Sequence, residues 1–180
     1  MALPVVPALP TWLVPSSDGR TARRARLGRG RAVWHALPME GVVELIRSER
    51  LYPGVPYAYA ATAPAGTRFI FLAGSCPLAA DGATAALGDY RGQAVQALAN
   101  LQTALSDASA RLTDVIFSRV LVATSERSDL VAVWDVVAEA FGPHDAPSTL
   151  VGVSVLGYPD QLVEIEAIAA VPADTSAGAG

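Results

Sequence analysis

Two glutamates lie inside a strand-like run near the C-terminal end of the 180-residue chain. Residues 162–169 alternate, so that one face carries Leu162, Glu164, Glu166 and Ile168 and the other carries Val163, Ile165, Ala167 and Ala169. A carboxylate in an apolar strand is costly unless it reaches water, a hydrogen-bond donor or a charged partner. The pattern supports two interpretations equally: a solvated strand face, or a site into which one glutamate points as an acid or base.

The residues around this run form a wider pattern. A small residue and a proline at 146–147 precede a strand-like run at 149–156, a turn signal at 157–160 and Val-Glu-Ile-Glu-Ala-Ile-Ala at 163–169. This arrangement resembles the C-terminal signature of the Rid (YjgF/YER057c/UK114) family, which contains enamine and imine deaminases and their relatives. The resemblance covers about residues 52–170, because further landmarks stand upstream in the family's order: Pro56-Tyr57, residues 69–75, Pro77-Leu78, residues 93–100 and residues 114–116.

The resemblance implies a site as well as a fold. Family members are trimers in which three sheets form a central barrel, with a ligand cleft at each subunit interface. In active members an arginine grips the substrate carboxylate, and a glutamate orients the water that attacks the iminium carbon. By motif position, Tyr57 matches the family's site tyrosine, Gly74 its strand-end glycine and Glu164 its catalytic glutamate.

Three positions depart from the family pattern. Ser148 stands where the arginine is expected, Leu150 replaces a cysteine or small residue, and Trp134 falls on a position that is often asparagine. Losing a charge-assisted pair in a cleft costs about 2–5 kcal/mol, which is roughly a thirty- to several-thousand-fold loss of binding. We therefore expect a reshaped, more apolar cleft and no ordinary turnover of small 2-imino acids. Arg119, inside a strand-like run, either binds substrate or pairs with Glu164 or Glu166.

The composition excludes several chemistries. All 13 basic residues are arginine, so the chain has neither a Schiff-base lysine nor a phosphate-binding loop of the Walker type. The single cysteine, Cys76, rules out an internal disulfide and fits a cytoplasmic, reducing location, and a buried apolar role is favoured over a nucleophilic one. Two distant histidines offer no metal cluster, so we expect neither a metal nor another cofactor.

The chain divides into three parts by composition. Residues 1–40 form a Pro-rich and Arg-rich extension, 41–171 the Rid-like domain and 172–180 a disordered tail. The arginines of the extension are compatible with a nucleic-acid or anionic-surface patch, a targeting segment, or a strap on the acidic domain or a neighbouring subunit, and the strap is favoured. No apolar run is long enough to span a membrane.

Periodicity predicts the elements. A short helix is expected within residues 39–50, then paired strands at 57–61 and 67–75, a helix from Asp89, a strand at 114–124, a helix capped by Ser128 and ended by Gly142-Pro143, and the two C-terminal strands. This order indicates an α+β domain with both helices on one face of a mixed sheet. The other face is expected to be buried in a homo-oligomer.

Three hypotheses about function remain open. The first is a diverged Rid-family enzyme that hydrolyses or tautomerises a small imine, enamine or related metabolite, with Glu164 as acid or base and Tyr57 as donor. The second is a non-catalytic trimer that binds a small molecule or has a structural role. The third is nucleic-acid binding by the arginine-rich extension, since ribonuclease activity has been attributed to some family members; it is the least favoured.

Overall fold

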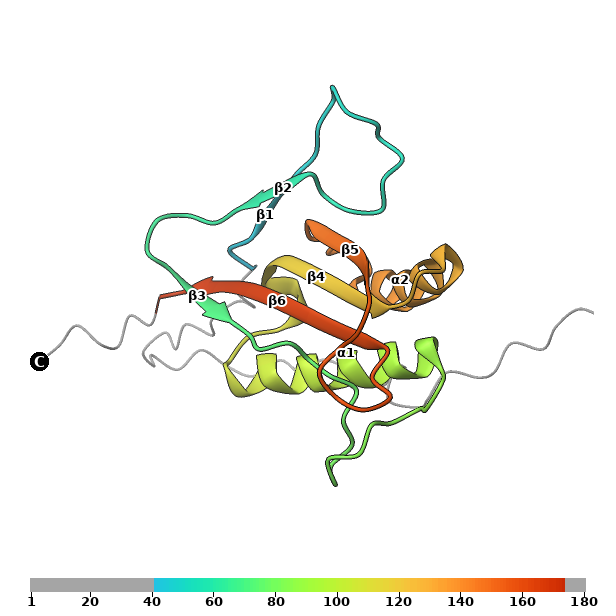
Figure 1. Ribbon diagram of the computed structural model, residues 1–180. Coiled ribbons are helices and arrows are strands. Elements are labelled where there is room, and N and C mark those ends of the chain that lie inside the picture. The colour runs from blue at the N-terminus through green and yellow to red at the C-terminus, as the bar shows by residue number, and fades with distance from the viewer. Residues whose placement is uncertain (1–40, 174–180) are drawn as a thin grey trace, which may run out of the picture. The chain divides into compact units, whose positions relative to one another are not determined.

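The computed structural model describes residues 41–173. The principal sheet of this part of the chain has four strands. Its order is β3-β6-β4-β5 (Figure 1), with β6 antiparallel to both of its neighbours. Strands β4 and β5 are parallel, because a crossover through helix α2 connects them. The sheet is therefore mixed, as predicted, and its strands are β3 (Thr67–Phe71), β4 (Val115–Ala123), β5 (Ser148–Val153) and β6 (Val163–Pro172).

Two helices, α1 (Tyr90–Asp107) and α2 (Arg127–Phe141), cover one face of this sheet (Figure 1). Asp89 is the N-cap residue of α1, as predicted, although its side chain makes no capping hydrogen bond. Helix α2 ends at Gly142, where φ is +55°, a conformation that favours glycine. The prediction that Ser128 caps α2 was wrong, because the N-cap is Glu126 and Ser128 lies inside the first turn.

The core lies between the sheet and the helices. Val163, Ile165, Ala167 and Ala169 of β6 are at most 3% exposed, so this face of the strand packs on the helices. Glu164 and Glu166 lie on the opposite face, as the alternation predicts. In β4 a register shift between Val115 and Phe117 interrupts the alternation. Strict alternation would put Ile116 on the same face as Val120, but Val115 is the residue buried in the core instead.

The face of the sheet that the helices leave uncovered is largely apolar, and we call it the open face. Leu121 of β4 and Val151 of β5 are register partners on it. At the β3 edge Phe69 is 50% exposed and Phe71 is 77% exposed. Such an apolar surface on a folded chain is typical of an interaction site.

The N-terminal part of the domain differs from the prediction. Instead of a helix within residues 39–50, the chain forms strand β1 (Glu44–Ile46), antiparallel to β2 (Ala60–Thr62). The expected pairing of 57–61 with 67–75 was also wrong, since β3 pairs with β6. Leu45 is the only residue of β1 that packs on the core, which is too little to hold a helix there, and β2 satisfies the backbone of β1 instead.

The remaining elements agree with the predicted order, with a 3₁₀ turn at Leu112–Asp114 before β4. Strand β6 runs to Pro172, the first residue of the expected tail. The predicted Pro-rich and Arg-rich extension, residues 1–40, and residues 174–180 lie outside the described residues. Between residues 41 and 173, no helix is both long and apolar enough to cross a bilayer.

Candidate functional site

The carboxylate of Glu164 is held by three residues that approach it from neighbouring segments. The side-chain amide of Gln161 donates a hydrogen bond to Oε2 at 3.0 Å, and the thiol of Cys76 lies 3.5 Å from the same oxygen. A methyl group placed on Gly74 would lie only 2.0 Å from Oε1, so the glutamate occupies space that glycine leaves free. We call Gly74, Cys76, Gln161 and Glu164 the glutamate group.

Two polar side chains on helix α1 hold the segments that carry the glutamate group. Gln93 is fully buried; its side chain accepts a hydrogen bond from the Leu162 amide at 2.7 Å and donates to the Asp160 carbonyl at 2.9 Å. Asn100 donates to the carbonyl of Cys76 at 2.8 Å. Because these residues lie two turns apart on one helix face, α1 fixes both segments relative to each other.

Cys76 is protonated at neutral pH in this environment. Partial burial, the negative charge of Glu164 and the hydrogen bond to it raise the pKa of the Cys76 thiol to about 11. A protonated thiol donates a hydrogen bond but is a poor nucleophile. The raised pKa agrees with the preference against a nucleophilic Cys76, but the expected buried apolar role is not observed, because the side chain is only partly buried and contacts the Glu164 carboxylate.

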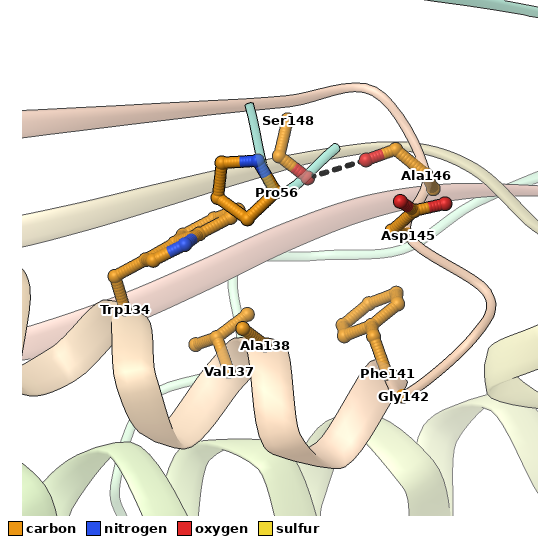
Figure 2. Close-up of a pocket in the computed structure, with 9 residues that line it drawn as sticks. All are labelled: Pro56, Trp134, Val137, Ala138, Phe141, Gly142, Asp145, Ala146 and Ser148. Atoms are coloured by element: carbon orange, nitrogen blue, oxygen red, sulfur yellow. Dashed lines mark hydrogen bonds between the residues drawn. The ribbon is translucent and has the colours of Figure 1, made fainter. Parts of the chain in front are cut away.

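A second set of candidate residues gathers beside strand β5. Tyr57, Trp134, Ser148 and Leu150 line a cavity of about 330 Å³. The ring of Trp134 meets that of Tyr57 edge-on, with centroids 6.2 Å apart. An adjoining cavity of about 180 Å³ shares Trp134 and Ser148 and extends along α2 to Val137, Phe141 and Asp145 (Figure 2). We call these two connected cavities the aromatic cleft.

Two polar side chains of the aromatic cleft, Ser148 and Asp145, have partners within the chain. The Ser148 hydroxyl donates to the carbonyl of Ala146 at 3.0 Å (Figure 2) and lies 2.6 Å from the hydroxyl of Ser118. The carboxylate of Asp145 pairs with Arg47, whose guanidinium also donates to the carbonyl of Tyr57 at 3.3 Å. The cleft thus has mainly apolar walls, with the polar groups of Tyr57 and Trp134 among them and one neutralised ion pair at its edge.

The glutamate group and the aromatic cleft lie on opposite faces of the sheet. Ser148 is the register partner of Ser118, which is fully buried on the helix side. Glu164 is the register partner of Leu121 on the open face. A single chain therefore does not bring Glu164 and Gly74 together with Tyr57, Trp134, Ser148 and Leu150, which the family resemblance assigns to one cleft at a subunit interface.

Arg119 belongs to neither set. Its guanidinium lies 2.9 Å from the Glu166 carboxylate, its register partner on the open face. Of the alternatives that the sequence left open, pairing with a glutamate is the one observed in the single chain. In the described part of the chain, no group of three or more His, Cys, Asp or Glu side chains could hold a metal ion.

Comparison with known proteins identifies the family. The model of the endoribonuclease L-PSP family matches residues 48–171. The chain belongs to the Rid (YjgF/YER057c/UK114) family. A RutC family protein of Pyrococcus horikoshii is 36% identical over 114 residues, which cover 63% of this chain and 86% of that protein.

Solved structures of Rid proteins have the same fold. YyfB of Yersinia pestis, described as a protein of unknown function of the conserved Rid family, is 31% identical with a TM-score of 0.68; the match covers 72% of this chain and 99% of that one. YyfA of the same organism is 27% identical with a TM-score of 0.51, over 72% and 99% of the two chains. The predicted Rid fold, with a mixed sheet and two helices, is confirmed.

The sequence did not point to several residues of the glutamate group and the aromatic cleft of this Rid protein. Gln161 was not among the candidate residues, yet it is 4% exposed and its side chain donates a hydrogen bond to Glu164. A glutamine three residues before a strand glutamate was the available signal. Arg47 and Asp145 are 98 positions apart, and no local pattern connects them.

Proposed function

We propose that this Rid protein is a cofactor-free enzyme that hydrolyses the C–N bond of a small imine, or of an enamine through its imine tautomer, in clefts between the subunits of a homotrimer. The observation that carries the proposal is the Glu164 carboxylate, which Gln161 and Cys76 hold against the bare backbone of Gly74. Two hydrogen-bonding side chains orient one carboxylate, and Gly74 leaves the room that it occupies. Such preorganisation is what a general base requires.

A second copy of the chain completes the site in this proposal. The glutamate group faces the open side of the sheet, whereas the aromatic cleft lies on the helix side at the β5 edge. Packing of the apolar open faces in a trimer, as in other Rid proteins, would bring the Glu164 of one subunit to the Tyr57 and Trp134 of another. The exposure of Phe69 and Phe71 supports burial of that face in an assembly.

The proposed chemistry needs one base and one water. Glu164 takes a proton from water as the oxygen attacks the iminium carbon, so that a C–O bond forms and the C=N pair of electrons moves to nitrogen. The proton is then passed to nitrogen, the C–N bond breaks, and ammonia leaves as the carbonyl forms. The balance is R₂C=NH₂⁺ + H₂O → R₂C=O + NH₄⁺. Tyr57 is proposed as a donor to the developing hydroxyl.

Ribonuclease activity, which the name of the family model mentions, is not the function that we propose. Residues 41–173 carry seven arginines against fourteen aspartates and glutamates, and such an acidic domain repels a polyanion. A non-catalytic ligand-binding trimer is the second candidate. It is supported by Ser148, whose hydroxyl is engaged within the chain at the position of the family's arginine.

The test is ammonia release from imines generated in situ by a flavin-dependent oxidase. We expect the full-length protein to accelerate release above the oxidase alone, and Glu164→Gln to remove the acceleration while the molecular mass in solution stays the same. Glu139→Gln, an exposed site on α2, is the matched control and should retain full activity. Acceleration that survives Glu164→Gln, or none with any imine, would refute hydrolysis by Glu164.

A further inference from the structure

We infer that the aromatic cleft selects apolar imines and enamines that carry no carboxylate, in their neutral or protonated iminium form, and discriminates against 2-imino acids. This inference deepens the proposed function and rests on it for the chemistry, but the selectivity can be measured by binding alone. It follows from three features of the cleft: a Ser148 hydroxyl whose hydrogen is already engaged, an edge aspartate already paired with an arginine, and aromatic walls.

The hydroxyl of Ser148 has no proton to offer a ligand. A serine hydroxyl has a single donor hydrogen, and the carbonyl of Ala146 is one acceptor within reach of Ser148. Either hydroxyl can donate the 2.6 Å hydrogen bond between Ser148 and fully buried Ser118, so the Ser148 hydrogen points to Ala146 or to Ser118 and is engaged within the chain in both cases. A substrate carboxylate would therefore find no donor in the Ser148 hydroxyl, so Ser148 is not a weaker version of an anion site.

The charge at the edge of the cleft disfavours an anion. Asp145 lines the cavity along α2, and its charge is balanced by Arg47, which does not line either cavity. Among the described residues that line the aromatic cleft, none is an arginine. A bound carboxylate would have to compete with Asp145 for Arg47, whereas a protonated nitrogen can share the Asp145 carboxylate.

The walls fit an apolar group of moderate size. Trp134, Val137 and Phe141 supply ring and methyl surface along the cavity of about 180 Å³. An apolar cavity of about 150 Å³ holds a benzene molecule, so a phenyl or branched alkyl side chain has room. An iminium cation can also lie over the indole of Trp134, since aromatic faces attract cations.

The activity test uses substrate pairs that differ only in the carboxylate. A flavin-dependent amine oxidase converts 2-phenylethylamine to its imine, and an L-amino-acid oxidase converts phenylalanine to the corresponding 2-imino acid. We expect the Rid protein to accelerate ammonia release from the first at least about tenfold more than from the second, the scale of one unfavourable charge contact. Equal acceleration, or a preference for the 2-imino acid, would overturn the inference and leave the proposed hydrolysis standing.

The binding test needs no turnover. Calorimetry with 2-phenylethylamine and 3-phenylpropionate compares a cation and an anion of similar size, and we expect the amine to bind at least about tenfold more tightly. Asp145→Asn releases Arg47 and should reduce or reverse the preference for the amine. Asp135→Asn, which changes an exposed ion-paired aspartate on α2, is the matched control and should leave that preference unchanged. Tighter binding of the anion to the wild-type protein, or binding of neither compound, would overturn the inference.

The two tests separate the two proposals. Selective amine binding with no ammonia release from any imine would support the selectivity and refute the hydrolysis. Ser148→Arg adds a gain-of-function arm, because it restores a cation at the family's anchor position and should shift both binding and turnover toward the carboxylate-bearing compound. If that variant does not fold, the Asp145→Asn ratio still decides the question.

Discussion

The sulfur of Cys76 lies 3.5 Å from Oε2 of Glu164, at the end of a segment that Asn100 of helix α1 anchors through the Cys76 carbonyl. The Cys76 thiol thus donates a hydrogen bond to the carboxylate of Glu164, which lies on the open face of the sheet. Burial and the neighbouring carboxylate both favour the neutral thiol. The contact explains why a cysteine can sit beside the proposed base without competing with it as a nucleophile.

Cys76 should react slowly with thiol reagents. Because its pKa is about 11, we expect its rate with iodoacetamide at pH 8 to be roughly a hundred-fold or more below that of an unperturbed thiol of pKa about 8.5. The rate should keep rising tenfold per pH unit beyond pH 9. Since the chain has one cysteine, labelling reports this residue alone, and the urea-unfolded protein is the control. A rate that levels off near pH 9 would contradict the assignment.

The raised pKa of Cys76 makes the free energy of unfolding depend on pH in the alkaline range. The folded-state pKa of Cys76 lies above the ordinary value of 9.0, so the unfolded chain loses this proton first as the pH rises. The free energy of unfolding should therefore fall between about pH 9 and pH 11, and be unaffected by this group below that range. Urea titrations of wild type and Cys76→Ala measure the effect, which the variant should lack.

Gly74→Ala should impair the site without unfolding the protein. The new methyl group would lie 2.0 Å from Oε1 of Glu164, and the flexible carboxylate can rotate away. We expect a roughly ten- to hundred-fold loss in kcat from the displaced base, with a change of about 1 kcal/mol or less in stability. Gly157→Ala, where a methyl group meets nothing within 4 Å, is the control. Full activity in Gly74→Ala would show that the observed carboxylate position is not the working one.

The Gln161→Met variant should show whether Gln161 positions Glu164 or binds the substrate. It keeps the size of a side chain that is 4% exposed but removes its 3.0 Å hydrogen bond to Glu164. We expect kcat to fall about tenfold or more with little change in KM, and stability to fall by about 1–3 kcal/mol because the Tyr158 amide loses its acceptor. Gln102→Met, at an exposed site on α1, should change neither kcat nor stability. An increase in KM alone would assign Gln161 to substrate binding instead.

Leu121→Glu should break the assembly. Leu121 lies in the middle of the open face, between its register partners Glu164 and Val151. If three open faces pack together, an added charge there is buried without a partner and the trimer dissociates. Light scattering should give three times 18.6 kDa for the wild type and a smaller mass for the variant. Val95→Glu, at a 57% exposed site on α1, should leave the mass unchanged; an intact trimer of Leu121→Glu would place the interface elsewhere.

The sequence predicted the helices and strands whose residues follow a periodic apolar pattern. The alternation in β6 separated Glu164 from Val163 correctly, and the apolar spacing in α1 and α2 located both helices, since both patterns follow from burial against one core. The bulge at Ile116 and the β1–β2 pair were missed. Both depend on backbone pairing with distant segments, which leaves no periodic signal.

The site was predicted only as a set of residues. Motif positions identified Glu164, Gly74 and Tyr57, but their arrangement depends on strand register, which places Ser148 beside buried Ser118 and Glu164 beside Leu121. The polar partners of the site come from segments far apart in the chain: Gln93 and Asn100 on α1 hold the glutamate group, and Arg47 pairs with Asp145. A single sequence gives no measure of such contacts.

The separation of the glutamate group and the aromatic cleft onto opposite faces has a genetic consequence. Two inactive variants, one altered in Glu164 and the other in the aromatic cleft, would each retain the half that the other lacks. When they are unfolded together and reassembled in equal amounts, about a quarter of the interfaces would pair two intact halves. Activity should then reappear in a mixture of two proteins that have none alone, so defects at this one site would complement each other between alleles.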